Sequence, residues 1–369
     1  MKIDFANLNL QYKIHKSEID NSMKRVLQKS NFIMGEEVFK LEKILENFTN
    51  AKYCITCSNG TDALILAMMS LGIGRGDEVI TTPFSYISTA EIISIMGAKP
   101  VFCDIDFESF NINEEDINKL ITKKTKAILP VSLFGQPANL TKIEKIAKDN
   151  NLKVIIDGAQ SFGSTINDIK DSYMGDISTT SFFPAKPLGC YGDGGAVFTN
   201  KKNLAEKIKM LRIHGQNKRY HHKFIGLGAR LDTLQAAVLI SKMKFYKKEI
   251  IARQKVANYY EKELSNINHI LTPKIAEKKK SVWAQYTIRV KKKRDFLQNQ
   301  LYQANIPTAI HYPKPMHLQQ CFRYLGYKRG DFPVAESASK EVLSLPMNPY
   351  LKKSQLKHIC SVVRESLKI

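Results

Sequence analysis

Long apolar runs are missing from this sequence of 369 residues. Its hydrophobic stretches all stop well short of the ~18 residues that span a bilayer, so we expect neither a membrane protein nor a membrane partner. The N-terminal stretch MKIDFANLNLQYKIHK has no continuous apolar segment and no small-residue cleavage site. This argues against a secretory signal and predicts a cytoplasmic protein.

Cysteine is scarce, and the six cysteines are scattered without the spacing of a disulfide framework, which fits a reducing compartment. The only close pair is Cys54 and Cys57. It has neither the second ligand pair of a zinc site nor a thioredoxin-like context. We therefore expect this pair at the edge of a buried strand, and no bound metal.

Acidic residues are outnumbered, since 56 Lys and Arg against 35 Asp and Glu leave a net charge of +21. Such an excess is typical of nucleic-acid-binding proteins, so a basic regulator is one hypothesis. The lysines are scattered over expected helix surfaces and are not interleaved with aromatic residues. We favour a solvated surface whose positive field attracts anionic small molecules, and we expect no nucleic-acid partner.

The two common nucleotide fingerprints, GxGxxG and GxxxxGK[ST], are also absent. From about residue 50, short apolar stretches instead alternate with helical ones, which predicts an α/β domain with a mostly parallel sheet covered on both faces. Expected strands lie at 77–84, 99–106, 125–135, 152–159, 177–183 and 194–200, and expected helices at 59–73 and 139–151.

After residue 200 the pattern becomes helical. The expected apolar faces are Leu204, Ile208 and Leu211 on one helix, and Leu231, Leu234, Val238 and Phe245 on another. Further on we expect a half-buried strand at 281–290, a helix at 294–306 and a proline-rigid extended stretch at 307–317. The prediction is a large domain over residues 1–245 and a smaller α+β domain over residues 246–369.

Two stretches have polar residues at places where a ligand could bind. SNGTDAL places Gly60 and Thr61 at the start of a helix, where backbone amides can cradle a phosphate, although a plain N-cap explains the same residues. KVIIDGAQ ends a buried strand with Asp157, followed three residues on by Gln160. A buried carboxylate is costly unless a cation or hydrogen bonds meet it, so it pairs with a pyridinium nitrogen or caps the next turn.

The stretch SFFPAKPLGCYGDGG places Lys186 between Pro184 and Pro187, with the hydroxyl of Ser181 just before them. A rigid, partly buried lysine is the Schiff-base arrangement, although a surface lysine on a proline turn has the same spacing. Tyr86 follows the end of another strand, where it stacks on a flat heterocycle or belongs to the core. A phosphate, a flat cationic ring and an aldehyde together describe pyridoxal 5'-phosphate (PLP).

The chain resembles the DegT-type family of PLP-dependent sugar aminotransferases. The likeness is carried, in the family's order, by the stretches SNGTDAL, TTPFSYISTAE, DGAQSFG, SFFPAKPLGCYGDGGA, LRIHGQNKRYHHKFIGLGARLDTLQAAVL and IPTAIHYPKPMHLQ. It implies the α/β fold of the type I PLP-dependent transferases, with a mostly parallel mixed sheet flanked by helices and a smaller C-terminal α+β domain.

The resemblance also implies roles for single residues. Lys186 would bond to the cofactor aldehyde and carry the proton, Asp157 would pair with the ring nitrogen, and Gln160 would contact the ring hydroxyl. The phosphate would be held by Gly60, Thr61 and Ser181, Tyr86 would stack on the ring, and Arg230, His311 and Tyr312 would bind the sugar. Family members have an Asn that touches the neighbouring subunit's cofactor where this chain has Gly228, which puts that contact in doubt unless a backbone amide replaces it.

The activity implied by the resemblance is transfer of an amino group from L-glutamate to a nucleotide-linked keto sugar within a homodimer, for lipopolysaccharide or another surface glycan. The motifs most resemble enzymes that aminate C3 of a UDP-linked 2-acetamido-3-keto sugar or a dTDP-linked 3-keto-6-deoxyhexose. Amination at C4 of a UDP-linked 4-keto-6-deoxy sugar is the alternative. A related branch uses histidine in place of the lysine and removes a hydroxyl, which Lys186 argues against.

Overall fold

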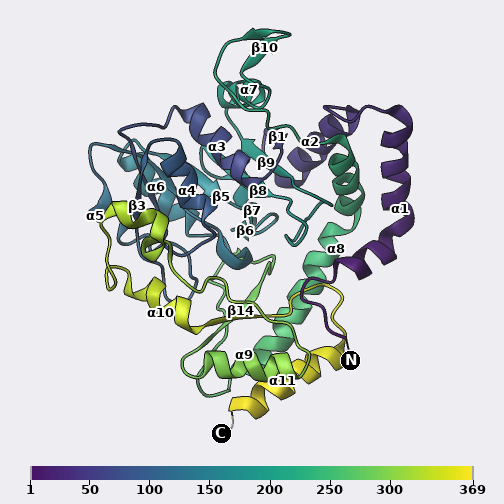
Figure 1. Ribbon diagram of the computed structural model, residues 1–369, viewed down its shortest axis with the longest axis vertical. Coiled ribbons are helices and arrows are strands. Elements are labelled where there is room, and N and C mark those ends of the chain that lie inside the picture. Colours follow the sequence, from purple (N-terminus) through teal and green to yellow (C-terminus); the bar gives the residue numbers. More distant parts are fainter. Residues whose placement is uncertain (1, 368–369) are drawn as a thin grey trace.

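The computed structural model describes residues 2–367, and its largest element is a seven-stranded sheet in the order β1-β9-β8-β5-β4-β2-β3 (Figure 1). The strands are β1 (Tyr53–Cys57), β2 (Glu78–Thr81), β3 (Lys99–Phe102), β4 (Thr125–Leu129), β5 (Lys153–Asp157), β8 (Ile177–Ser181) and β9 (Gly195–Thr199). Only β9 runs antiparallel to its neighbours, β1 and β8. The predicted mostly parallel, mixed sheet is confirmed.

Helices cover both faces of this sheet, because alternate residues of each strand point to opposite sides. Ile155 packs on the side covered by α3 (Gly60–Leu71), α4 (Ser88–Ile95) and α7 (Lys202–Leu211). The opposite side, where Ile156 points, is covered by α5 (Ile117–Leu120) and α6 (Leu140–Asp149), and farther along by α2 (Glu36–Thr49) and the first half of α8 (Thr233–Leu264). The two helices predicted at 59–73 and 139–151 correspond to α3 and α6.

The cysteine pair lies in β1, which is an edge strand of the sheet. Cys54 and Cys57 are both buried, and burial raises the pKa of both thiols. The prediction of a buried pair at a strand edge is confirmed. Thiols with a raised pKa are poor nucleophiles, so this pair serves packing.

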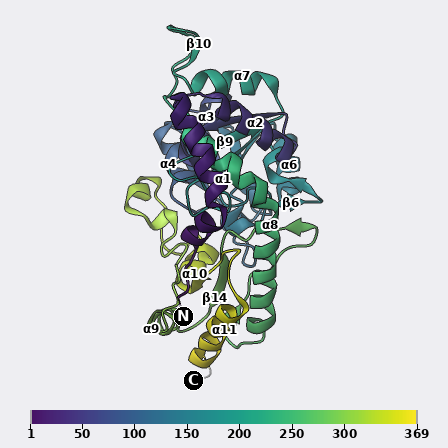
Figure 2. The same cartoon turned by 90° about the vertical axis from the view of Figure 1, so that its right-hand side faces the viewer.

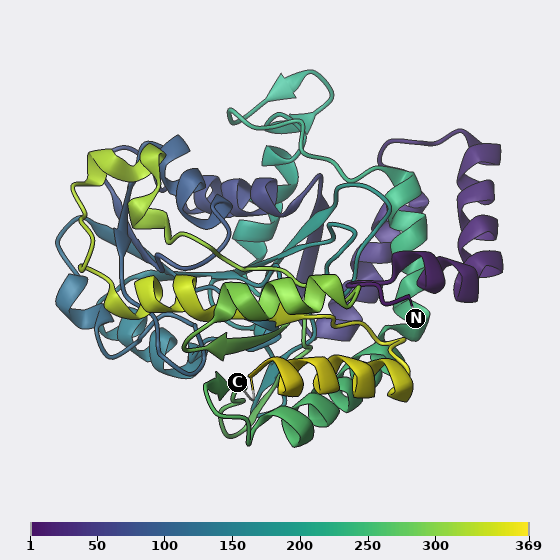
Figure 3. The same ribbon diagram turned by 60° about the horizontal axis from the view of Figure 1, so that its bottom comes forward.

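A second, smaller sheet lies in the C-terminal part of the chain. It is antiparallel and contains β12 (Ile270–Leu271), β14 (Tyr286–Val290) and β15 (Val342–Leu345) in the order β12-β14-β15. The C-terminal half of α8, α9 (Arg294–Gln303) and α11 (Lys353–Leu367) pack on it (Figures 1 and 3). The predicted half-buried strand is wrong in its burial: every residue of β14 is buried, because Arg289 on the other face bonds to Glu341 and to the Phe107 carbonyl.

Helix α8 is continuous through the predicted domain boundary at 245 and 246, which stays a prediction. Its expected apolar face is partly wrong. Leu231 lies before the first turn, and the buried aromatic residue is Tyr246 rather than the half-buried Phe245. Val238 is buried as expected, and Tyr246 packs on the Phe162 ring and donates its hydroxyl to the Phe162 carbonyl at 2.5 Å.

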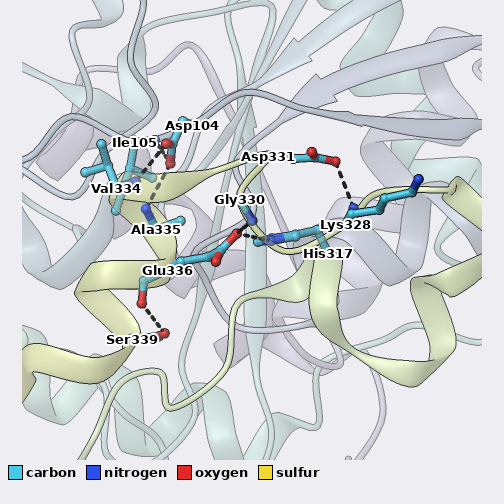
Figure 4. Close-up of polar contacts among 10 residues, drawn as sticks. All are labelled: Asp104, Ile105, His317, Lys328, Gly330, Asp331, Val334, Ala335, Glu336 and Ser339. Carbon is cyan, nitrogen blue, oxygen red and sulfur yellow. Dashed lines mark hydrogen bonds and ion pairs between the residues drawn. The ribbon is translucent and has the colours of Figure 1, made fainter.

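The C-terminal part is also attached to the edge of the large sheet through α10 (Pro333–Glu341). Asp104, which follows β3, accepts hydrogen bonds from the backbone N–H groups of Val334 and Ala335, both at 2.9 Å (Figure 4). Glu336 lies 3.1 Å from Nε2 of His317 and accepts from the Gly330 N–H at 2.6 Å. These contacts attach the segment between α9 and β15 to the edge of the large sheet.

Two peripheral elements stand out in the views. A hairpin of β10 (Gln216–Lys218) and β11 (His221–His222) projects from the body beyond α7 (Figures 1 and 2). Helix α1 (Leu8–Lys29) packs along α8. Short strands β6 (Thr165–Ile166), β7 (Ile169–Lys170) and β13 (Lys279–Lys280) form a separate small sheet.

Within residues 2–367, no helix has both the length and the apolar character needed to cross a membrane.

Candidate active site

The beginning of α3 lies against the end of β8 and forms a cradle for an anion. Asn59 caps the helix by accepting the Asp62 N–H at 2.7 Å, which leaves the N–H groups of Gly60 and Thr61 without partners among the described residues. A Cβ built on Gly60 would lie 2.7 Å from the Cβ of Ser181, so only glycine permits this approach. Two free N–H groups, a serine hydroxyl and the positive end of a helix fit a phosphate.

Asp157 is the last residue of β5 and is 4% exposed. Its Oδ2 accepts the Thr89 hydroxyl at 2.7 Å, and its Oδ1 accepts the Ala159 N–H at 3.2 Å. A carboxylate has about four lone-pair positions, so it can still accept a hydrogen bond from a ring N–H. The sequence analysis missed Thr89, although a buried threonine on the first turn of α4, within the quoted TTPFSYISTAE stretch, was a usable signal.

Lys186 lies on a tight turn that begins at the end of β8, where its N–H donates to the Phe183 carbonyl at 2.9 Å. The side chain is half-buried. Loss of solvent around the amine lowers the pKa of Lys186, and the negative charge of Asp157 acts in the opposite direction. A larger fraction of neutral amine makes Lys186 a better nucleophile than an ordinary surface lysine. Because the charge of Asp157 acts on the amine of Lys186, the two side chains lie in one site.

Gln160 and two tyrosines complete the wall of the site. Gln160 accepts the Phe134 N–H at 2.8 Å and donates to the hydroxyl of Tyr312 at 3.1 Å. The rings of Tyr312 and Tyr86 lie 6.4 Å apart between their centroids. Because Tyr86 is 58% exposed, the reading as a core aromatic is wrong, and its ring is free to stack on a flat ligand.

His311 reaches the same site from the C-terminal part of the chain. Its Nδ1 lies 3.0 Å from the Ser344 hydroxyl. Burial lowers the pKa of His311 to about 4, and the nearby charge of Lys186 acts in the same direction. The imidazole is therefore neutral at physiological pH and can serve a polar ligand as a hydrogen-bonding group. Burial likewise raises the pKa of Tyr312, which keeps its hydroxyl protonated.

Gly228 and Arg230 lie on the stretch that leads into α8. Gly228 is exposed and forms an isolated bridge with Ile213, while Arg230 is half-buried. Between them, the Ala229 carbonyl accepts the Ser58 N–H at 3.2 Å, which places this stretch beside the start of α3. Within residues 2–367, the hydrogen bonds of Asp157, Gln160 and the Lys186 backbone go to other residues than Gly228 and Arg230.

The chain is similar to three known proteins over most of their length. The chain is 45% identical over 361 residues to UDP-2-acetamido-2-deoxy-3-oxo-D-glucuronate aminotransferase of Pseudomonas aeruginosa, covering 98% of this chain and 99% of the relative. It is 38% identical over 361 residues to dTDP-3-amino-3,6-dideoxy-alpha-D-galactopyranose transaminase of Aneurinibacillus thermoaerophilus, covering 98% of each chain. The crystal structure of NtdA from Bacillus subtilis with bound cofactor PMP superposes with a TM-score of 0.93 at 29% identity, covering 100% of this chain and 86% of that one.

These likenesses span nearly the whole chain, and the profile of the DegT/DnrJ/EryC1/StrS aminotransferase family matches residues 13–364. The predicted enzyme class and fold are confirmed, and the predicted cofactor agrees with the PMP of the solved relative. With its lysine, carboxylate and phosphate cradle in one site, the chain belongs to the DegT/DnrJ/EryC1/StrS aminotransferase family.

Proposed function

We propose that this protein uses PLP to transfer an amino group from L-glutamate to C3 of a nucleotide-linked keto sugar. The observation that carries the proposal is the meeting of Lys186, Asp157 and the cradle of Gly60 and Ser181 at the carboxyl ends of neighbouring strands. Ligands bind at this edge in open parallel sheets. Each of these groups matches one part of PLP: its aldehyde, its ring nitrogen and its phosphate.

When bound, PLP supplies a carbonyl that takes up the amino group and a ring that accepts electrons from the carbon losing its proton. The residues of this chain then have separate tasks. Gly60, Thr61 and Ser181 would hold the phosphate, while Asp157, oriented by the hydrogen bond from Thr89, would keep the ring nitrogen protonated. Lys186 would hold the cofactor at its aldehyde, and its free amine would move the proton from the donor's α-carbon.

The sugar side of the site is assigned to His311, Tyr312 and Arg230. His311 is neutral and half-buried, so it can donate to or accept from a sugar hydroxyl without adding a charge. Names of two relatives support C3: a 3-oxo-glucuronate aminotransferase and a 3-amino-galactopyranose transaminase. Amination at C4 is not favoured. The net charge of +21 gives an anionic nucleotide sugar an attractive field.

We further propose a homodimer in which the stretch around Gly228 faces the neighbouring subunit's cofactor. Gly228 is exposed and has no side chain, so a backbone amide would have to make this contact. Equilibrium sedimentation should find two copies, and a fully active monomer would contradict the dimer. We place the activity in the cytoplasm, since all six cysteines are free thiols.

The test is to measure the two half-reactions separately. Protein loaded with PLP should release one equivalent of 2-oxoglutarate from L-glutamate without a sugar, and should then aminate members of a panel of UDP- and dTDP-linked 3-keto and 4-keto sugars. Borohydride reduction should place the pyridoxyl group on Lys186. Lys186→Ala should lose both half-reactions, while Lys201→Ala, a change to an exposed lysine, should keep them. Turnover by Lys186→Ala, or a preference for 4-keto sugars, would contradict the assignment.

A further inference from the structure

The loop that carries Lys186 closes on itself. The Cys190 N–H donates to the Phe182 carbonyl at 2.8 Å, which joins the two ends of the loop. Inside it, a Cβ on Gly189 would lie 2.4 Å from the Pro184 carbonyl oxygen, so Gly189 is in close backbone contact with the residue two positions before Lys186. A shift of Gly189 therefore moves the turn that aims the Lys186 amine.

Helix α8 holds this loop from outside at two points. Gln235 accepts the Tyr191 N–H at 2.8 Å, and the amine of Lys242 donates to the Gly189 carbonyl at 2.7 Å. Gln235 and Lys242 are seven residues apart, which is two helical turns, so both point from the same face of α8. The backbone on each side of Cys190 is thereby attached to one rigid helix.

Lys242 is an unusual anchor because it is 2% exposed. Burial lowers the pKa of Lys242 to about 8, against the opposing charge of Glu249, with a smaller effect of Cys190. The amine also lies 4.4 Å from the ring centroid of Tyr191, a cation-π distance. Glu249, one further pair of turns along α8, is held by Gln11 at 3.0 and 3.1 Å and by the hydroxyl of Tyr350.

A buried lysine is a costly way to satisfy one carbonyl, since burying a charge without a close partner is unfavourable. Among residues 2–367, Lys242 forms no salt bridge, and Glu249 acts on its amine only as a nearby charge. Besides its position over the Tyr191 ring, the amine has one hydrogen bond among the described residues, to the Gly189 carbonyl in the loop of the reactive lysine.

We propose that Lys242 is a positioning residue for Lys186, holding the Gly189 carbonyl so that the loop presents the amine to the cofactor aldehyde. The inference rests on the proposed function. The step concerned is attack of the Lys186 amine on the aldehyde carbon, in which a C=N bond forms and one water leaves. In this role Lys242 acts through the Gly189 carbonyl and would not itself touch substrate or cofactor.

The experiment separates aiming from binding. Pyridoxine 5'-phosphate has the ring and phosphate of PLP but no aldehyde, so its affinity reports the site without the Lys186 reaction. Lys242→Met removes the donor at similar length. We expect attachment of Lys186 to PLP, followed by the visible absorbance band and by borohydride labelling, to slow on the order of tenfold or more, because small misplacements of reacting groups are costly. Affinity for pyridoxine 5'-phosphate should stay within about twofold.

The matched control is Lys244→Met, two residues along the same helix, where the lysine is exposed and paired with Glu18. It should behave as the wild type, and Lys242→Arg, which keeps a cationic donor, should recover most of the attachment rate. If Lys242→Met fails to fold, Gln235→Leu removes the other anchor and should show the same selective slowing.

Attachment at the wild-type rate in Lys242→Met, or an equal loss of attachment and of pyridoxine 5'-phosphate affinity, would overturn the positioning role. A wild-type protein that binds neither PLP nor pyridoxine 5'-phosphate would instead overturn the proposed function, and this inference with it. The two failures are therefore distinguishable from one set of titrations.

Discussion

Gly60, the first residue of α3, approaches Ser181, the last residue of β8, so closely that their Cβ positions would be 2.7 Å apart if Gly60 had a side chain. Real Cβ atoms do not come this close, so any larger residue has to push the helix away from the strand. The distance between helix start and serine hydroxyl sets the size of the anion cradle.

Gly60→Ala should therefore weaken phosphate binding. We expect the affinity for pyridoxine 5'-phosphate to fall on the order of tenfold, equivalent to about 1.4 kcal/mol, as measured by fluorescence titration. Gly74→Ala is the matched control, because a Cβ there meets only the Met96 carbonyl oxygen, at an ordinary 3.6 Å. Equal affinities in Gly60→Ala and wild type would show that the phosphate is held elsewhere.

Thr89→Val should lower turnover while leaving the fold intact. The change keeps the side-chain volume but removes the hydroxyl that donates to Asp157 at 2.7 Å. A hydrogen bond to a charged group contributes roughly 1.5–3 kcal/mol, so we expect kcat for the glutamate half-reaction to fall on the order of tenfold. Thr89→Ser, which retains the hydroxyl, should restore most of the rate. An unaffected kcat in the valine variant would mean that Asp157 needs no such support.

His311 should not be the group that titrates near neutral pH. Burial lowers the pKa of His311 to about 4, so the imidazole is already neutral at pH values well above that. His311→Gln is expected to raise KM for the sugar while leaving the shape of the kcat/KM profile unchanged between about pH 5.5 and 8. An acidic limb near the ordinary histidine pKa that disappears in the variant would contradict this expectation.

Asp171 should make stability fall as pH rises. It is fully buried beneath Gly158, and burial raises the pKa of Asp171 from 3.8 to about 6, despite hydrogen bonds from Ser161 and Ser172. Between these two values the folded protein binds more protons than the unfolded chain, so this residue's contribution is present at low pH and is lost as pH rises through about 6.

Asp171→Asn removes that titration. Denaturant unfolding across this pH range should show the wild type losing about 3 kcal/mol relative to the variant, corresponding to the shift from 3.8 to about 6. Asp168→Asn, a change to an exposed neighbour paired with Lys280, is the control and should follow the wild type. Parallel pH curves for wild type and Asp171→Asn would show that the buried carboxyl does not titrate in this range.

The residues at strand ends were predictable because chemistry and position are both visible in a sequence. Asp157 ends an apolar run, and Lys186 lies between two prolines, so each is unusual without knowledge of its neighbours. Thr89, which bonds to Asp157 across 68 positions of sequence, is an ordinary helix residue until the two elements meet. The same holds for Lys242 and Gly189, which are 53 positions apart.

Burial of whole elements was harder to predict than their existence. Six of the seven strands of the large sheet, and the helices α3 and α6 that cover it, lie within the expected ranges, because the apolar period of a segment reflects its own backbone. No range was predicted for β1 or α4. Alternation in 281–290 correctly indicates a strand, but it says nothing of what covers the polar face. There Arg289, stacked 3.8 Å from the ring centroid of Phe107, fills the space and buries the strand on both sides.

Helix α8, at 32 residues and about 1.5 Å per residue, is a rod roughly 48 Å long. Its first turns supply Ala236 and Leu239 to the packing beneath the large sheet, and its last turns supply Tyr260 and Leu264 to the packing around the small one. A cut at residue 245 would leave each fragment with one half of α8 and with apolar residues that the other fragment no longer covers. We therefore expect the two pieces, produced alone, to aggregate, and to recover activity only when they are co-expressed.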